Sequence, residues 1–245
     1  MFTTSALVLK RSDYRDYDRM LTLLSPVYGR MEAVARGAKR PKSPLISATE
    51  LFCAGEFGFV STKGGLTLTE CTIIDSYYPL RERYDLLIHA SYVLVLLLHA
   101  ALPGERSEAL FHLGLEALAH LSYSELPPEL VSAMFEMHLM HLLGQAPMAS
   151  HCARCGIEAG AGMVFDARLG GVLCPKCRGT GPSTPISEGA RRILMKAPRA
   201  QFKTVELLPE RPEWPEAAAL MRAFMRQRMD VRSWPRLFGE EEPGY

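Results

Sequence analysis

The first third of the chain alternates apolar and polar positions in short runs, which is the pattern of half-buried β-strands. Gly64 and Gly65 fall between the last two runs and favour a tight hairpin turn there. Five strands with a longer connection after the third predict a small closed barrel with the OB-fold, and an SH3-like barrel is the main alternative. The expected strands cover residues 5–10, 19–24, 30–36, 51–60 and 66–74.

After residue 80 the apolar spacing becomes that of helices. Proline before an apolar run and glycine after it mark helix ends, as Pro128 and Gly144 do for one of these runs. The expected helices cover residues 81–102, 105–121, 129–143, 187–195 and 214–231.

This order of elements predicts a multidomain α+β protein. We expect an OB-fold domain that binds nucleic acid over residues 1–79 and a helical domain over 80–147 and 182–238. A small module with four cysteines, 148–181, is inserted between the two helical segments. The residues 239–245, rich in acid and glycine, are expected to be a disordered tail.

The composition is that of an ordinary globular protein, with 48% hydrophobic residues, 22% charged residues and a net charge of +1. This balance excludes a polycation that coats nucleic acid with its whole surface, so any such function must come from local patches. The most apolar stretch, 86–102, is short for a membrane span and contains two histidines, so we expect a buried helix. The N-terminus has no signal-peptide pattern, which predicts a cytoplasmic protein.

Two CxxC pairs, Cys152 with Cys155 and Cys174 with Cys177, are separated by eighteen residues. This spacing is typical of a tetrahedral four-cysteine zinc site. Four protein thiolates leave no coordination position for water or substrate, so we expect one structural zinc ion per chain. A redox or disulfide pair is the alternative, although a reducing cytosol favours metal.

The segment Arg30–Lys42 contains five cations and one anion, a larger positive charge than that of the whole chain. It runs from a predicted strand into a glycine-containing turn, which favours a surface for phosphate groups. A solvated basic loop without a partner is the alternative. The cations proposed to contact DNA are Arg30, Arg36, Lys39, Arg40 and Lys42.

A second basic region, Arg191–Arg236, contains eleven cations and five acids. On its predicted helix, Arg222 and Arg226 lie four residues apart on the side opposite the apolar face, and they are further candidates for DNA contact. Exposed aromatic rings in the barrel could also stack on bases, but for each of them we favour packing over an end of the barrel. The aromatic candidates are Tyr14, Tyr17 and Tyr28.

Two stretches of the barrel sequence stand out: Ala6–Arg11 with Asp16–Arg19, and Tyr28–Arg30 followed by Ala33–Ser43. They resemble the bacterial RecO family of recombination mediators. The first is similar to the opening of the family, and the second closely matches its signature. The resemblance is specific over residues 5–45, and the CxxC pairs occur in many members of the family.

The resemblance implies an OB-fold, a helical domain and a zinc module in a DNA repair and homologous recombination mediator of the RecF pathway. It implies binding to single- and double-stranded DNA and annealing of complementary strands. The implied partners are RecR and single-strand-binding protein, with RecA loading as the indirect outcome, in the nucleoid and away from membranes.

Catalysis is not expected, because the sequence has no GxxxxGK[ST] loop and no Ser-His-Asp or paired-acid constellation with recognisable spacing. His138 and His141 could share a metal, but no HExxH motif accompanies them. Two other functions remain open: an RNA-binding translation factor, because OB barrels and four-cysteine modules occur there too, and a protein adaptor without DNA affinity.

Overall fold

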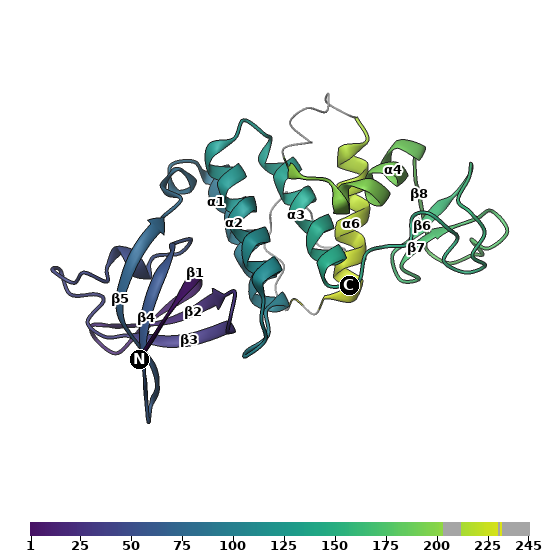
Figure 1. The fold of residues 1–245 in the computed structure, drawn as a ribbon. Coiled ribbons are helices and arrows are strands. Elements are labelled where there is room, and N and C mark those ends of the chain that lie inside the picture. The colour runs from purple at the N-terminus through teal and green to yellow at the C-terminus, as the bar shows by residue number, and fades with distance from the viewer. Residues whose placement is uncertain (203–211, 230, 232–245) are drawn as a thin grey trace. The chain divides into compact units, whose positions relative to one another are not determined.

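The computed structural model describes residues 1–202, 212–229 and 231 (Figure 1). The described chain divides into two compact units, 1–128 and 129–231. The helices of the predicted helical domain are distributed over both units. The first contains α1 (Tyr84–Ala100) and α2 (Glu108–Tyr123), and the second contains α3 (Pro128–Leu142), α4 (Glu188–Lys196) and α6 (Trp214–Arg228).

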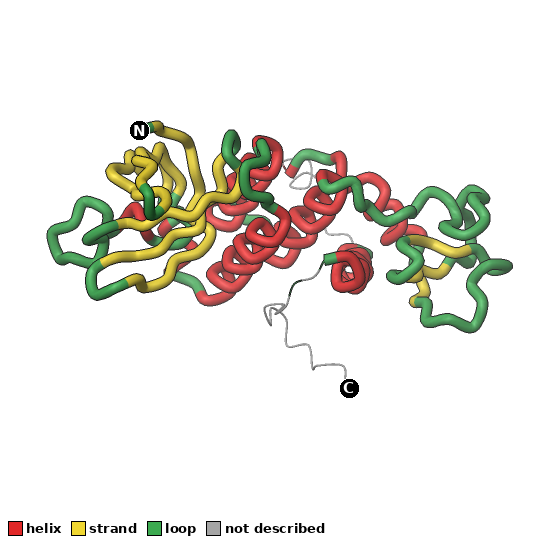
Figure 2. Tube along the Cα trace, turned by 90° about the horizontal axis from the view of Figure 1, so that it is seen from below, coloured by secondary structure: helices red, strands yellow, loops and turns green. Residues whose placement is uncertain are grey.

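The first unit begins with a closed barrel in the strand order β1-β2-β3-β5-β4, which confirms the predicted OB-like barrel (Figures 1 and 2). Neighbouring strands are antiparallel except for β3 and β5, which are parallel because the long connection after β3 carries the chain across the barrel. Each predicted strand has its counterpart. The strands are β1 (Phe2–Tyr14), β2 (Asp18–Ser25), β3 (Gly29–Ala35), β4 (Ala54–Thr62) and β5 (Gly65–Asp75).

Alternation along each strand places one set of side chains inside the barrel. In β3, Met31, Ala33 and Ala35 are buried, while Glu32 between them is exposed. Ala38 extends this buried series beyond the end of β3, so the first turn of the basic segment is anchored in the barrel core. The loop that follows therefore starts from a fixed position.

Helices α1 and α2 pack on each other and on β1 within the same unit. Gly114 of α2 permits this close packing, because a Cβ at this position would lie 2.6 Å from a methyl group of Leu97. A glycine also permits the close approach between the β2–β3 turn and the segment after α1. Gly29 has a positive φ of 65°, and a Cβ there would lie 2.2 Å from the carbonyl oxygen of Leu102.

The second unit contains the cysteine module and the remaining helices. The predicted hairpin of the module is present as β6 (Val164–Asp166) and β7 (Gly171–Leu173), and a two-residue strand, β8 (Thr184–Pro185), adds to β6. The rings of Phe165 on β6 and Phe224 on α6 meet edge to face with centroids 6.5 Å apart, so the module is packed against α6.

The structure differs from the sequence expectations at one short strand and at the end of one helix. Strand β8 was not predicted, because two residues are too few to show an alternating pattern. Helix α6 ends at Arg228 rather than at Val231: Met229 has extended dihedral angles, and Val231 is buried beyond it. The predicted tail, 239–245, lies outside the described residues. Within the described chain, no helix is both long enough and apolar enough to cross a membrane.

Candidate nucleic-acid interface and metal centre

The basic loop, residues 36–42 directly after β3, is held against the β1–β2 hairpin by three hydrogen bonds. The backbone N–H of Lys39 donates to the carbonyl oxygen of Tyr17 at 3.0 Å. The N–H of Gly37 donates to Oδ1 of Asp18 at 2.8 Å, and Nζ of Lys39 donates to Oδ2 of Asp13 at 2.8 Å. The loop and the hairpin therefore form one surface.

The connection from β3 to β4, which begins with the basic loop, is also attached near its far end, where Glu50 forms ion pairs with Arg11 and Arg19. Arg19 on β2 donates to Oε1 of Glu50 at 2.9 Å and to the hydroxyl of Thr49 at 2.8 Å. Arg11 on β1 donates to the same carboxylate oxygen at 2.7 Å. Since both ends of the connection are attached to β1 and β2, its middle is positioned by the barrel.

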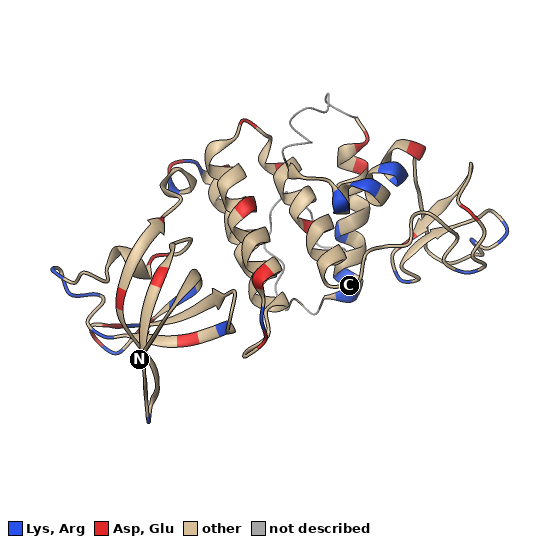
Figure 3. Ribbon diagram, in the orientation of Figure 1, with Lys and Arg blue, Asp and Glu red and all other residues tan. Residues whose placement is uncertain are grey.

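Three predicted DNA contacts, Arg36, Arg40 and Lys42, are exposed on this loop. Within the part of the chain that the structure describes, none of the three forms an ion pair with an acidic side chain. Lys and Arg gather on the loops that leave the barrel on the side away from α1 and α2 (Figure 3). Cations without acidic partners keep their full charge for an external anion.

Lys39, the fourth predicted contact, belongs to the same loop but is already paired. Its side chain is 30% exposed, whereas that of its partner Asp13 is 72% exposed. The hydrogen bond from Lys39 and its charge hold the pKa of the Asp13 carboxyl below its usual value of 3.8. The charge of Lys39 is thus partly compensated before any ligand binds.

Arg30, the fifth predicted contact of this segment, lies on β3 and is half-buried. Its guanidinium donates to the carbonyl oxygen of Leu98 in the last turn of α1, at 2.9 Å. A cation at a helix C-terminus stabilises the orphan carbonyl groups there. Arg30 therefore joins the barrel to α1.

The two arginines predicted on α6 differ in their surroundings. Arg222 forms an ion pair with the fully buried Glu136 of α3, with Nε 3.2 Å from Oε1, and its own side chain is only 16% exposed. Arg226 lies in the last turn of α6 and is exposed. Arg222 consequently has a structural role in the second unit, since it compensates a buried carboxylate.

The three tyrosines also have different environments. Tyr28 packs against Phe2 with ring centroids 5.0 Å apart, which is the end-packing role favoured from the sequence. Tyr14 lies under the guanidinium of Arg15, at 5.2 Å from its ring centroid. Tyr17 is 54% exposed and lies under the guanidinium of Arg40, at 5.5 Å.

Arg15 was not singled out from the sequence, although its place beside Tyr14, between the first two predicted strands, was a usable signal. Glu50 and Asp13, which organise the loop, could not be identified from the sequence because their partners are far away along the chain. Arg19 and Glu50, for example, are separated by 31 positions.

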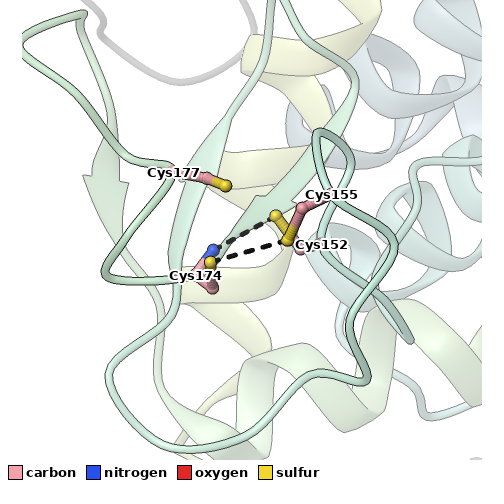
Figure 4. A group of neighbouring side chains, drawn as sticks. All are labelled: Cys152, Cys155, Cys174 and Cys177. Atoms are coloured by element: carbon pink, nitrogen blue, oxygen red, sulfur yellow. Dashed lines mark hydrogen bonds between the residues drawn. The ribbon is translucent and has the colours of Figure 1, made fainter.

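The four cysteines predicted to bind zinc come together, with all their sulfurs within 4.8 Å of one another (Figure 4). Sγ of Cys155 lies 3.8 Å from Sγ of Cys174. A tetrahedron with metal–sulfur distances of about 2.3 Å places its sulfurs about 3.8 Å apart, so this donor set fits a tetrahedral metal ion. All four are free cysteines, and none of them forms a disulfide.

Backbone groups also prepare this site for a cation. Burial raises the pKa of the Cys152 thiol, but backbone N–H groups, including those of Cys155 and Cys174, donate to its sulfur and lower the pKa to about 6. Contacts with the sulfurs of Cys155 and Cys174 raise the pKa of Cys177 to about 12. Four thiolates cannot accumulate side by side without a compensating charge, which a bound divalent cation supplies.

The alternative pair, His138 and His141, has a different arrangement. Nδ1 of His138 lies 2.7 Å from the carbonyl oxygen of Met134, and Nε2 lies 2.6 Å from that of Ala200. Its ring also stacks on Phe202 with centroids 5.2 Å apart. A carbonyl oxygen thus lies in hydrogen-bonding distance of each ring nitrogen, so neither nitrogen of His138 is open to a metal ion.

Comparison with known proteins matches two family models to the chain. The model described as recombination protein O N terminal matches residues 1–77, and that described as recombination protein O C terminal matches residues 81–235. The chain is 34% identical to the DNA repair protein RecO of Moorella thermoacetica over 251 residues, which cover 100% of this chain and 92% of that protein. It is 34% identical to the protein of the same name from Symbiobacterium thermophilum over 201 residues, which cover 80% of this chain and 77% of that protein.

Proposed function

Since this chain belongs to the RecO family of DNA repair proteins, we propose that it is a recombination mediator that binds single- and double-stranded DNA and anneals complementary strands. The proposed role is binding and positioning of strands, and it requires no catalytic centre. The site of action is the nucleoid in the cytoplasm.

The observation that carries this proposal is the positioned basic loop on the barrel. Arg36, Arg40 and Lys42 are exposed, and within the described residues they have no acidic partners. The connection from β3 to β4, which begins with the loop, is attached to β1 and β2 near both of its ends. Phosphate binding therefore costs little conformational entropy of the chain. Lys39 contributes to the same surface when phosphate competes with Asp13.

The positive charge of this surface also explains how the protein would promote annealing. Two complementary strands repel each other through their phosphates, and cations that contact both backbones lower that repulsion. Arg226, which is exposed on α6, is a candidate for contact with the second strand. Arg30 and Arg222 support the surfaces rather than meet the phosphates, since each has a structural partner.

The proposed partners are RecR and single-strand-binding protein, with RecA loading as the consequence of their joint action on DNA that single-strand-binding protein covers.

The proposed role of the cysteine module is to stabilise the fold of the second unit. We assign one structural zinc ion to Cys152, Cys155, Cys174 and Cys177, because four thiolates in a tetrahedral arrangement suit zinc. Its binding would supply on the order of 10 kcal/mol toward folding this module.

A strand-annealing assay tests the proposal. Two complementary labelled oligonucleotides are mixed with the wild-type chain or with the Arg36→Ala/Arg40→Ala/Lys42→Ala variant, each with and without single-strand-binding protein. We expect the wild type to accelerate annealing and the variant to lose most of the acceleration. No acceleration by the wild type under either condition would refute the annealing role.

The same reagents separate the two remaining functions. An RNA-binding factor would prefer an RNA oligomer to a DNA oligomer of the same sequence and length in direct competition. A protein adaptor would show no measurable affinity for DNA even at low salt. We expect DNA binding that RNA of equal length does not displace preferentially.

A further inference from the structure

We propose that Tyr17 and Arg40 form a stacking site for one unpaired nucleobase at the junction of the β1–β2 hairpin and the basic loop. The inference rests on the proposed DNA binding and specifies what the site recognises: the flat face of a base, in addition to the phosphate.

The site is an open hollow of about 510 Å³ lined by Tyr17, Arg40, Pro41 and Lys42. One wall is an aromatic ring and another is a proline, and two cations complete the lining. Aromatic faces beside cations are the combination that proteins use to bind single strands, because the rings stack on bases and the cations follow the backbone.

Tyr17 is held in place although its side chain is more than half exposed. Its carbonyl oxygen accepts the hydrogen bond from the N–H of Lys39, so the residue is attached to the loop through its backbone, and this bond does not involve the ring. An exposed aromatic ring that a rigid backbone presents loses little conformational entropy when it binds a ligand.

The guanidinium of Arg40 covers the ring, with its central carbon 5.5 Å from the centroid. This contact is a cation–π interaction, which is weak at an exposed site. Within the described residues no carboxylate holds Arg40 there. A base can therefore take the place of the guanidinium over the ring, while Arg40 turns to the phosphate beside that base.

Such a site discriminates between single-stranded and duplex DNA. In a duplex both faces of each base are covered by its neighbours, whereas an unpaired base has a face to offer. Every base has such a face, so stacking tolerates any sequence. The surface consequently holds unpaired DNA in preference to duplex DNA and releases each base as it pairs.

The other tyrosines provide contrasts. Tyr28 is packed against Phe2, and Tyr14 lies outside the residues that line the hollow. Tyr84, at the start of α1, is 78% exposed and serves as a matched control because its substitution removes a surface tyrosine from another element of the same unit.

The experiment compares Tyr17→Ala, Tyr17→Phe and Tyr84→Ala in the full chain. Each protein is titrated with an oligothymidylate and with an abasic oligomer that has the same number of phosphates. We expect Tyr17→Ala to lose about 5- to 150-fold in affinity for the oligothymidylate, the range given by base stacking, and to bind the abasic oligomer like the wild type. Tyr17→Phe and Tyr84→Ala should bind both oligomers like the wild type.

Three results would overturn the stacking site while leaving DNA binding intact. The first is unchanged affinity of Tyr17→Ala for the oligothymidylate, and the second is an equal loss on both oligomers. The third is a loss for Tyr17→Phe as large as that for Tyr17→Ala, which would implicate the hydroxyl rather than the ring. If the wild type binds neither oligomer, the proposed function itself fails.

Discussion

Removal of the three exposed cations of the basic loop, Arg36, Arg40 and Lys42, should flatten the salt dependence of DNA binding. The variant Arg36→Ala/Arg40→Ala/Lys42→Ala leaves the attachment of the loop intact, because the hydrogen bonds to the β1–β2 hairpin involve Gly37 and Lys39 instead. All three side chains are exposed, so their truncation creates no cavity. Because Arg40 also lies over the Tyr17 ring, the slope of the salt dependence, rather than the affinity at one salt concentration, reports the electrostatic contribution of the loop.

The magnitude follows from the number of phosphates that these side chains neutralise. Each phosphate contact on a single strand contributes about −0.7 to the slope of log affinity against log salt, so three contacts contribute about −2. Over a fourfold rise in salt, from about 50 to about 200 mM, the wild type should lose roughly 20-fold more affinity than the variant. Lys39 is left in place because Asp13 already compensates part of its charge.

The assay is fluorescence anisotropy of a labelled oligothymidylate at several salt concentrations. The matched control removes the same net charge elsewhere, through Arg83→Ala/Arg106→Ala/Arg168→Ala, all exposed and outside both the barrel and the second basic region. We expect this control to keep the wild-type slope. Equal slopes for the wild type and the loop variant, or an equal change in the control, would refute the assignment of phosphate contacts to the loop.

Three further predictions concern the ion pairs and the cysteine cluster. Arg222→Ala should lower the free energy of unfolding by about 3–5 kcal/mol in denaturant melts, because it leaves the buried Glu136 without its guanidinium; a loss below about 1 kcal/mol would contradict this account. Cys174→Ser, or treatment with a strong chelator, should abolish stoichiometric metal in elemental analysis and increase proteolysis within 148–181, and an intact module without metal would disprove the structural role. The Asp13 carboxyl should titrate below its usual pKa in NMR and return toward 3.8 in Lys39→Ala; because the pKa is lowered in the folded chain, the stability gained from this pair is present above pH 3.8 and is lost as the pH falls through the lower value.

The elements of this protein were largely predictable because they depend on neighbours along the chain. Strand β3 alternates buried and exposed residues with period two, and Ser187 caps α4 by accepting a hydrogen bond from the N–H of Ala190. The CxxC spacing likewise predicted which sulfurs converge, since each pair forms one local turn. In all these cases the interacting groups are a few residues apart, or a repeated motif marks them.

Partners distant along the chain determine which cations are available, and no local pattern indicates them. Arg36, Lys39 and Arg40 look equivalent in the sequence, yet Asp13 pairs with Lys39 alone. Arg222 looks like a surface cation on an amphipathic helix, but Glu136 of α3 holds it in a buried ion pair. The chain's pattern thus located positive charge on the loop and on α6, whereas packing between remote segments decided which of those charges still face an external anion, because a charge is available only where no opposite charge lies within a few ångströms.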